Sequence, residues 1–226
     1  MATAAWITLA VLGVGGLIFG LITLSVYLDR RREAAIQAFA ESQGYAFDPK
    51  AKGARPWRDA GFELFERGSA RKAVNGISGA AGDVEIEAFD YRYTTGSGDD
   101  TQTHNLAVVG LRVPGAGLPA FSLQREHLGH KIASVFGAKD FDFEAHPDFS
   151  KRFHLRGPKE EPVRRLFDAG LIAHFEAMTA KLAVQAKGER LIVFAGKSAS
   201  KPERYAAFLD EALGLVLELT QRSTRG

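Results

Sequence analysis

The sequence contains no cysteine among its 226 residues. Disulfide bonds, thiolate nucleophiles and metal sites with cysteine ligands are therefore excluded. The sequence also lacks an excess of charge of one sign, because 29 Lys and Arg stand against 27 Asp and Glu, for a formal net charge of +2. A nucleic-acid-binding domain usually carries a dense basic surface, so we expect no nucleic-acid partner.

Charge is missing altogether from one long run near the start of the chain. Residues 4–28 read AAWITLAVLGVGGLIFGLITLSVYL, and Asp29-Arg30-Arg31-Arg32 follows directly. As a helix this run would extend about 37 Å, enough to cross the ~30 Å hydrocarbon core of a bilayer. We therefore predict an N-terminal tail at 1–4, a transmembrane helix at 5–28 and a juxtamembrane helix at 29–44.

A cleaved signal peptide is the alternative interpretation of the same run. It requires a basic segment before the apolar core and a small-residue cleavage site after it. Residues 1–28 contain no Lys or Arg, and SVYLDRRR offers no such site. A retained membrane anchor is the better interpretation.

The ends of the predicted span indicate its orientation. Trp6 and Tyr27 lie near the two ends, where amphipathic rings settle at the depth of the headgroups. The basic cluster Arg30, Arg31 and Arg32 follows the span, and basic residues remain on the cytoplasmic side. We expect these five residues at the membrane interface, the N-terminus outside and the rest of the chain in the cytoplasm.

Small residues form a stripe along one side of the predicted span. Gly13, Gly16, Gly20 and Thr23 share this side, and Gly16 and Gly20 form a GxxxG motif. Such motifs let two helix backbones approach closely in lipid, so the stripe predicts helix packing against another membrane subunit or a second copy of the chain. Glycine is also common in membrane helices, and a chance match is the alternative.

Residues 45–226 show the pattern of an α+β domain, with a possible subdivision near 115–150. The strongest feature is a long central hairpin formed by 84–93 and 104–113, joined by the polar tip TTGSGDDTQT at 94–103. Within 84–93 the apolar positions shift from even to odd residues, which indicates a bulge or a change in the covered face. Further strands are expected at 45–47, 62–65, 72–77, 121–124, 153–156, 182–184 and 191–194, and helices at 125–136, 160–167, 171–178 and 202–220.

Four segments of the domain resemble parts of chemical motifs. Gly196-Lys197-Ser198 lacks the earlier glycine of a phosphate-binding loop, because Leu191 occupies that position. His127 and His130 are three residues apart, which does not match the metalloprotease spacing. Glu144-Ala-His146-Pro-Asp148 and Gly96-Ser-Gly-Asp99-Asp100 offer possible ligand types in incomplete patterns. We therefore predict no catalytic, cofactor-binding or metal-binding residue, no cofactor and no enzymatic activity.

A basic stretch follows the possible subdivision. It consists of Arg152, Arg156, Lys159, Arg164 and Arg165. Such runs are usually solvated faces, but below a membrane this stretch could also contact lipid headgroups.

Five segments of the chain carry a resemblance: FDYRYTTGSG (89–98), THNLAVVGLRVP (103–114), PAFSL (119–123), FGAKDFDFEAHPDFSKRF (136–153) and LRGP (155–158). Together they are similar to a family of bacterial proteins with an N-terminal membrane helix and a cytoplasmic domain. The resemblance covers about residues 6–195. It implies a bacterial protein anchored in the inner membrane, and it provides no reaction, cofactor or catalytic residue to transfer.

Together these features favour a non-catalytic, single-pass inner-membrane protein. Its helix and cytoplasmic domain would pack against a larger integral-membrane complex, for example an energy-transducing one, as an accessory or scaffolding subunit. The alternative is a membrane-tethered enzyme or ligand-sensing domain whose pocket is formed by residues far apart in sequence.

Overall fold

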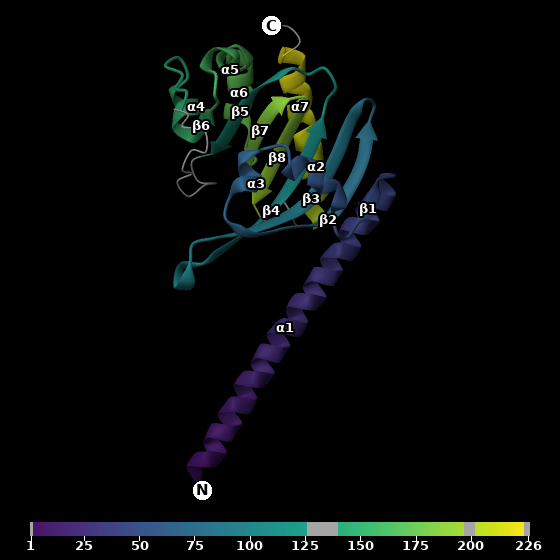
Figure 1. Ribbon diagram of the computed structural model, residues 1–226, viewed down its shortest axis with the longest axis vertical. Helices are drawn as coiled ribbons and strands as arrows, with labels where there is room; N and C mark the ends of the chain where they lie inside the picture. Colours follow the sequence, from purple (N-terminus) through teal and green to yellow (C-terminus); the bar gives the residue numbers. More distant parts are fainter. Residues whose placement is uncertain (1, 126–139, 197–201, 224–226) are drawn as a thin grey trace.

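The computed structural model describes residues 2–125, 140–196 and 202–223, and the side chains among them except those of residues 2–15, 18, 202 and 203. In this part of the chain, seven α-helices accompany one sheet of eight strands (Figure 1). The helices are α1 (Ala2–Ser42), α2 (Arg55–Arg58), α3 (Glu63–Glu66), α4 (Pro147–Arg152), α5 (Glu160–Leu166), α6 (Ala169–Ala177) and α7 (Pro202–Ser223). Two short 3-10 helices are η1 (Lys52–Ala54) and η2 (Gly98–Asp100).

All strand pairs in the sheet are antiparallel, and the order is β1-β2-β3-β4-β8-β7-β5-β6. The hairpins β2–β3, β3–β4 and β7–β8 join neighbours in sequence, whereas β4 and β8 join the two halves of the sheet. The expected α+β class and the long central hairpin are therefore confirmed. The strands are β1 (Ala46–Asp48), β2 (Ser69–Ala81), β3 (Val84–Thr95), β4 (Gln102–Arg112), β5 (Leu118–Arg125), β6 (Phe153–Arg156), β7 (Leu182–Gly188) and β8 (Arg190–Gly196).

One face of the sheet is covered by the end of α1 and by α4 to α7. On β3 this face carries Ile86 and Ala88, which lie in the same apolar core as Ile36 of α1 and Leu215 of α7. Strand residues alternate between faces, so the partners of these β3 residues on β4, Leu111 and Val109, belong to the same core.

The other face is covered by η1, α2 and α3, which lie in front of the central strands in Figure 1. Its core contains Trp57 of α2 and Phe65 of α3, packed with Phe89 and Tyr91 of β3. A Cβ atom on Gly110 of β4 would lie 2.6 Å from Cδ2 of Trp57, so the indole contacts the strand directly. Only a residue without a side chain fits at this position.

Helices packed on both faces of the sheet explain the shift of the apolar pattern in β3. The strand pairs with β4 in unbroken register, and the irregularities lie in its other neighbour, β2, between Ser69 and Lys72 and between Val74 and Ile77. Both faces of β3 are buried at its centre, so both even and odd residues are apolar there.

The prediction of a strand at 62–65 is wrong, because Glu63–Glu66 forms a single helical turn with Leu64 and Phe65 buried. A short apolar run fits a buried turn as well as a strand.

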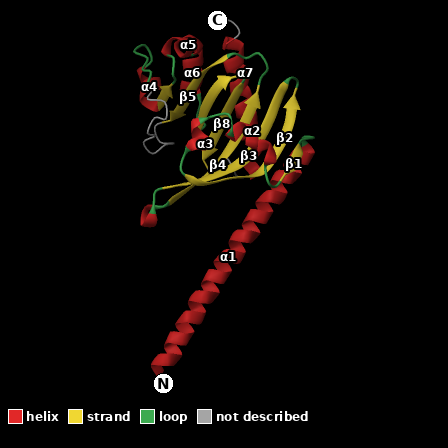
Figure 2. Cartoon of the chain, viewed as in Figure 1, coloured by secondary structure: helices red, strands yellow, loops and turns green. Residues whose placement is uncertain are grey.

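Helix α1 is one unbroken helix that extends from the domain (Figure 2). The predicted juxtamembrane segment 29–44 forms its last turns, and Gly44 follows the helix end with a φ of 72°, a conformation that favours glycine. Over the described residues, no helix combines the length and hydropathy needed to cross a bilayer. The span predicted at 5–28 therefore stays a prediction. The helix expected at 125–136 lies almost wholly outside the described residues.

Candidate functional site

The candidate site is the junction where α1 meets the domain, and it contains an ion pair between distant segments. Arg32 of α1 donates from Nε to Oδ2 of Asp90 over 2.8 Å, and its Nη2 lies 2.5 Å from Oδ1. The two side chains are 21% and 15% exposed. Two parallel hydrogen bonds fix the direction of the guanidinium as well as its distance, so this contact orients the helix on strand β3.

Asn75 completes the polar part of the junction. It is the extra residue of the irregularity in β2, it has a φ of 55°, and its Nδ2 donates to Oδ2 of Asp90 over 2.8 Å. The backbone N–H of Asn75 donates to the carbonyl of Pro49 over 3.1 Å. Asn tolerates the left-handed conformation better than most residues, which explains its presence at this point.

The apolar part of the junction lies one and two turns further along α1. Ile36 and Ala40 are fully buried in the main core, and the ring of Phe39 meets the ring of Tyr205 edge-on at 5.7 Å. Tyr205 lies near the start of α7 and is itself buried. Within the described residues its hydroxyl has no hydrogen-bond partner, and burial raises its pKa, so the hydroxyl stays protonated.

Glu87 is a second unusual group, on the opposite face of β3. Its side chain is buried against the backbone of Gly53, where a Cβ atom would lie 2.4 Å from either carboxylate oxygen. Burial, and to a lesser extent the negative charge of Asp48, raises the pKa of Glu87 to about 7. Glu87 can therefore gain or lose a proton near neutral pH, although it is not part of the junction.

Beyond the junction, α1 leaves the domain with its apolar side chains uncovered. Leu17, Phe19 and Tyr27 are 65%, 70% and 61% exposed. Further exposed apolar side chains lie on all sides of the helix, and they are Leu21, Ile22, Leu24, Val26 and Leu28. An uncovered apolar surface of this extent marks a site of contact with a membrane or another protein.

The small-residue stripe is partly described. Cβ atoms at Gly16 and Gly20 would meet nothing within 4 Å, so this side of the helix is open. Thr23 uses its hydroxyl within the helix, donating to the carbonyls of Phe19 and Gly20 at 3.0 and 2.9 Å. The side chain of Trp6 and the surroundings of Gly13 are not described.

The three arginines predicted at the membrane interface divide into two groups. Arg30 and Arg31 are exposed, as is Tyr27, whereas Arg32 turns toward the domain and binds Asp90. Helix geometry explains the division, because Arg32 shares a face with Ile36, four residues later, and that face packs on the sheet.

The remaining motifs gain no support as sites. His127, His130, Lys197 and Ser198 lie outside the described residues, and among those that the structure describes no three His, Asp or Glu side chains could hold a metal ion. Most of the basic stretch 152–165 is engaged within the protein. Arg156 pairs with Asp140, Arg164 with Glu160, Arg165 with Glu161, and Arg152 donates to the carbonyl of Glu176.

Sequence reasoning missed Asp90, Asn75 and Tyr205. A signal for Asp90 was present, because it is a charged residue on the even face of β3 that directly follows the apolar even positions Ile86 and Ala88. A buried carboxylate needs a cationic partner, but the sequence does not identify Arg32, 58 residues away, as that partner.

Comparisons with known proteins inform the fold alone. No protein-family model matches the chain, and no curated protein sequence matches it. Among solved structures, the chain is similar to the mycobacterial trehalose monomycolate transport factor A, TtfA, with a TM-score of 0.57 and 12% sequence identity. The likeness covers 85% of this chain and 94% of that chain, and at this identity it shows a shared fold.

Proposed function

We propose that the chain is a non-catalytic accessory subunit of a bacterial inner-membrane complex, anchored by α1 with its N-terminus outside and its domain in the cytoplasm. The observation that carries the proposal is the contrast within one continuous helix. Its last turns are held on the domain by Arg32 and Ile36, while the described side chains at 17 and 19–28 expose apolar surface on every side. Lipid or a neighbouring membrane helix would remove that surface from water.

The rigid junction gives the anchor a further role. A flexible linker would let the domain sample many orientations, whereas a continuous helix with a bidentate ion pair restricts it to one. A subunit that must present one face to a larger complex benefits from this restriction. The similar fold of TtfA, named as a transport factor, agrees with an accessory role.

The proposal is tested by adding bulk to the small-residue side of α1. The double variant Gly16→Ile/Gly20→Ile should lose membrane subunits that co-purify with the wild-type chain at fixed stoichiometry, because the backbones can no longer approach. Ser25→Ile is the matched control, since Ser25 lies on the opposite side of the helix. The packing model is wrong if the glycine variant and the control retain the same partners. Recovery of the wild-type chain in the soluble fraction would contradict the anchor itself.

A further inference from the structure

The domain carries exposed cations on the side from which the free part of α1 departs. We define the basic surface as Arg30, Arg31, Lys50, Lys52, Lys72 and Arg92. All six are exposed, and none has a carboxylate within ion-pair distance among the described residues. They come from four segments of the chain: α1, the stretch from the loop after β1 into η1, and strands β2 and β3.

The strand register places two of these cations directly opposite each other. Lys72 of β2 pairs with Arg92 of β3, on the face that carries Asp90 two residues earlier, roughly 7 Å away along the strand. Because Asp90 binds Arg32, the Lys72–Arg92 pair lies next to the point where α1 leaves the domain. Like charges directly opposite each other destabilise a sheet. A bound anion would therefore reduce the repulsion between Lys72 and Arg92, for which the described residues provide no carboxylate partner.

Two half-buried arginines of the domain are neutralised within the protein. Arg112 lies between Glu85 and Glu189, at 2.7 and 3.2 Å, and Arg222 lies between Asp168 and Glu218. The cations of the basic surface differ, because no ion pair joins them to a carboxylate among the described residues. The acids nearest to them in sequence are Asp29, Glu33, Asp48 and Asp90, and Asp90 is already bound to Arg32.

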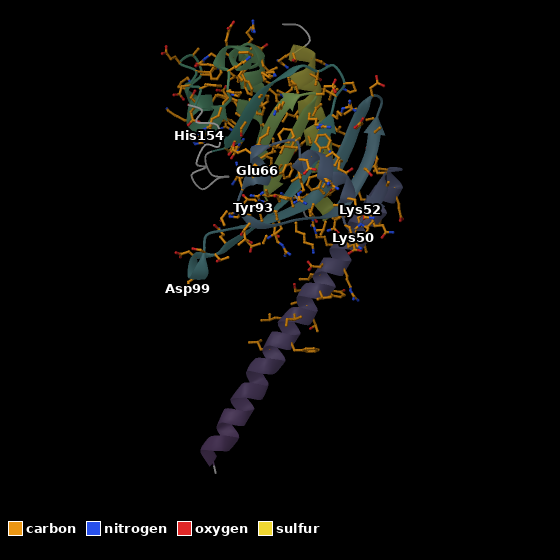
Figure 3. The ribbon with its side chains drawn as sticks, viewed as in Figure 1. Lys50, Lys52, Glu66, Tyr93, Asp99 and His154 are labelled. Atoms are coloured by element: carbon orange, nitrogen blue, oxygen red, sulfur yellow. The ribbon has the colours of Figure 1, made fainter. Side chains whose placement is uncertain are left out.

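The figures place Lys50 and Lys52 on the side of the domain from which α1 departs. Figure 3 shows Lys50 and Lys52 beside α1 at the lower border of the domain, and Asp99 at the end of the β3–β4 hairpin. The hairpin and the free part of α1 leave the domain on this same side (Figure 1). If α1 enters a membrane, the basic surface faces the headgroups.

We propose that the basic surface binds the anionic headgroups of the membrane in which α1 is anchored, so that the start of β2, the end of β3 and the start of β4 lie against the bilayer. The proposal rests on the membrane anchor proposed above. Lipid fits better than an acidic protein because Arg30 and Arg31 lie on the departing helix itself, and the Lys72–Arg92 pair lies next to the residue that binds that helix. Each basic residue near an anionic membrane surface strengthens binding about fivefold, and salt screens the attraction over ~8 Å.

The test uses the full chain in lipid nanodiscs. Because the sequence has no cysteine, Asn105→Cys, opposite Arg92 on β4, provides a single fluorophore site, and Ala169→Cys on α6 provides a distant one. Energy transfer to an acceptor on the headgroups is compared between zwitterionic discs and discs with about one third phosphatidylglycerol. The charge variant is Lys72→Glu/Arg92→Glu, and its matched control is Lys159→Glu/Lys187→Glu, whose residues are exposed and outside the basic surface.

We expect higher transfer from position 105 in anionic discs than in zwitterionic discs. The charge variant and about 0.5 M salt should abolish this gain, whereas the control variant should keep it. Transfer from position 169 should be the same in both lipids. Equal transfer in both lipids, with the chain incorporated, would overturn the lipid contact and leave the anchor standing. A gain that persists in the charge variant would also overturn it. Failure of the chain to enter either disc would overturn the anchor and the lipid contact together.

Discussion

Removal of the Arg32–Asp90 ion pair should loosen α1 from the domain. The pair is mostly shielded from water, and truncation of Asp90 also deprives the Asn75 amide of its acceptor. A hydrogen bond to a charged group contributes about 1.5–3 kcal/mol, and loss of one partner of a fully buried pair costs roughly 3–5 kcal/mol. Since one fifth of the Arg32 side chain remains exposed, we expect a coupling energy of about 2 kcal/mol.

A double-mutant cycle with Arg32→Ala and Asp90→Ala measures this coupling. Urea unfolding is followed through the buried Trp57, with Trp6 replaced by Phe so that a single tryptophan reports. The control cycle uses Arg55 and Asp59, which are 3.5 Å apart, 86% and 69% exposed, and should couple by less than about 0.5 kcal/mol.

Hydrogen exchange locates the effect. The amides of residues 33–42 should exchange faster in Asp90→Ala than in the wild type, while those at the centre of β4 should change less, because the helix end detaches before the sheet unfolds. The reasoning is refuted if the Arg32–Asp90 coupling is as small as that of the control pair.

Two further predictions concern the sheet. Gly110→Ala should destabilise the domain by about 1–3 kcal/mol in urea unfolding, because the added Cβ atom meets the Trp57 ring. Gly214→Ala in α7, where a Cβ atom has open space, should be neutral or slightly stabilising. Equal effects of the two substitutions would contradict the close contact at Gly110. For Glu87, the pKa rises from an ordinary 4.5 to about 7 on folding, so the folded state retains a proton that the unfolded state releases. Stability should therefore fall between pH 4.5 and 7, by about 2 kcal/mol in total, and Glu87→Gln should remove this fall; an unchanged slope in the variant would count against burial as its cause.

Local patterns predicted the elements whose periodicity is clear. The central hairpin follows from alternation in two strands with a polar tip between them, and α7 follows from a long helical pattern. The turn at Glu63–Glu66 was predicted as a strand because four residues do not distinguish the two periods.

The junction could not be predicted, because it depends on contacts between distant segments. The pairing of β4 with β8 and the approach of Arg32 to Asp90 are set by tertiary packing. The raised pKa of Glu87 has a similar origin, since Gly53, 34 residues earlier, approaches the carboxylate only in the folded chain. Sequence patterns predicted a membrane anchor and a domain, and the structure shows how helix α1 is joined to the domain.

Native mass spectrometry tests the central claim most directly. The full chain, with a C-terminal tag, is extracted from the membranes of its own host in mild detergent and transferred to the gas phase with its partners. The accessory-subunit account predicts assemblies in which the chain and one or more integral-membrane subunits occur at fixed stoichiometry. A chain that appears only as a monomer or homodimer would contradict it and favour the ligand-sensing or enzymatic alternative.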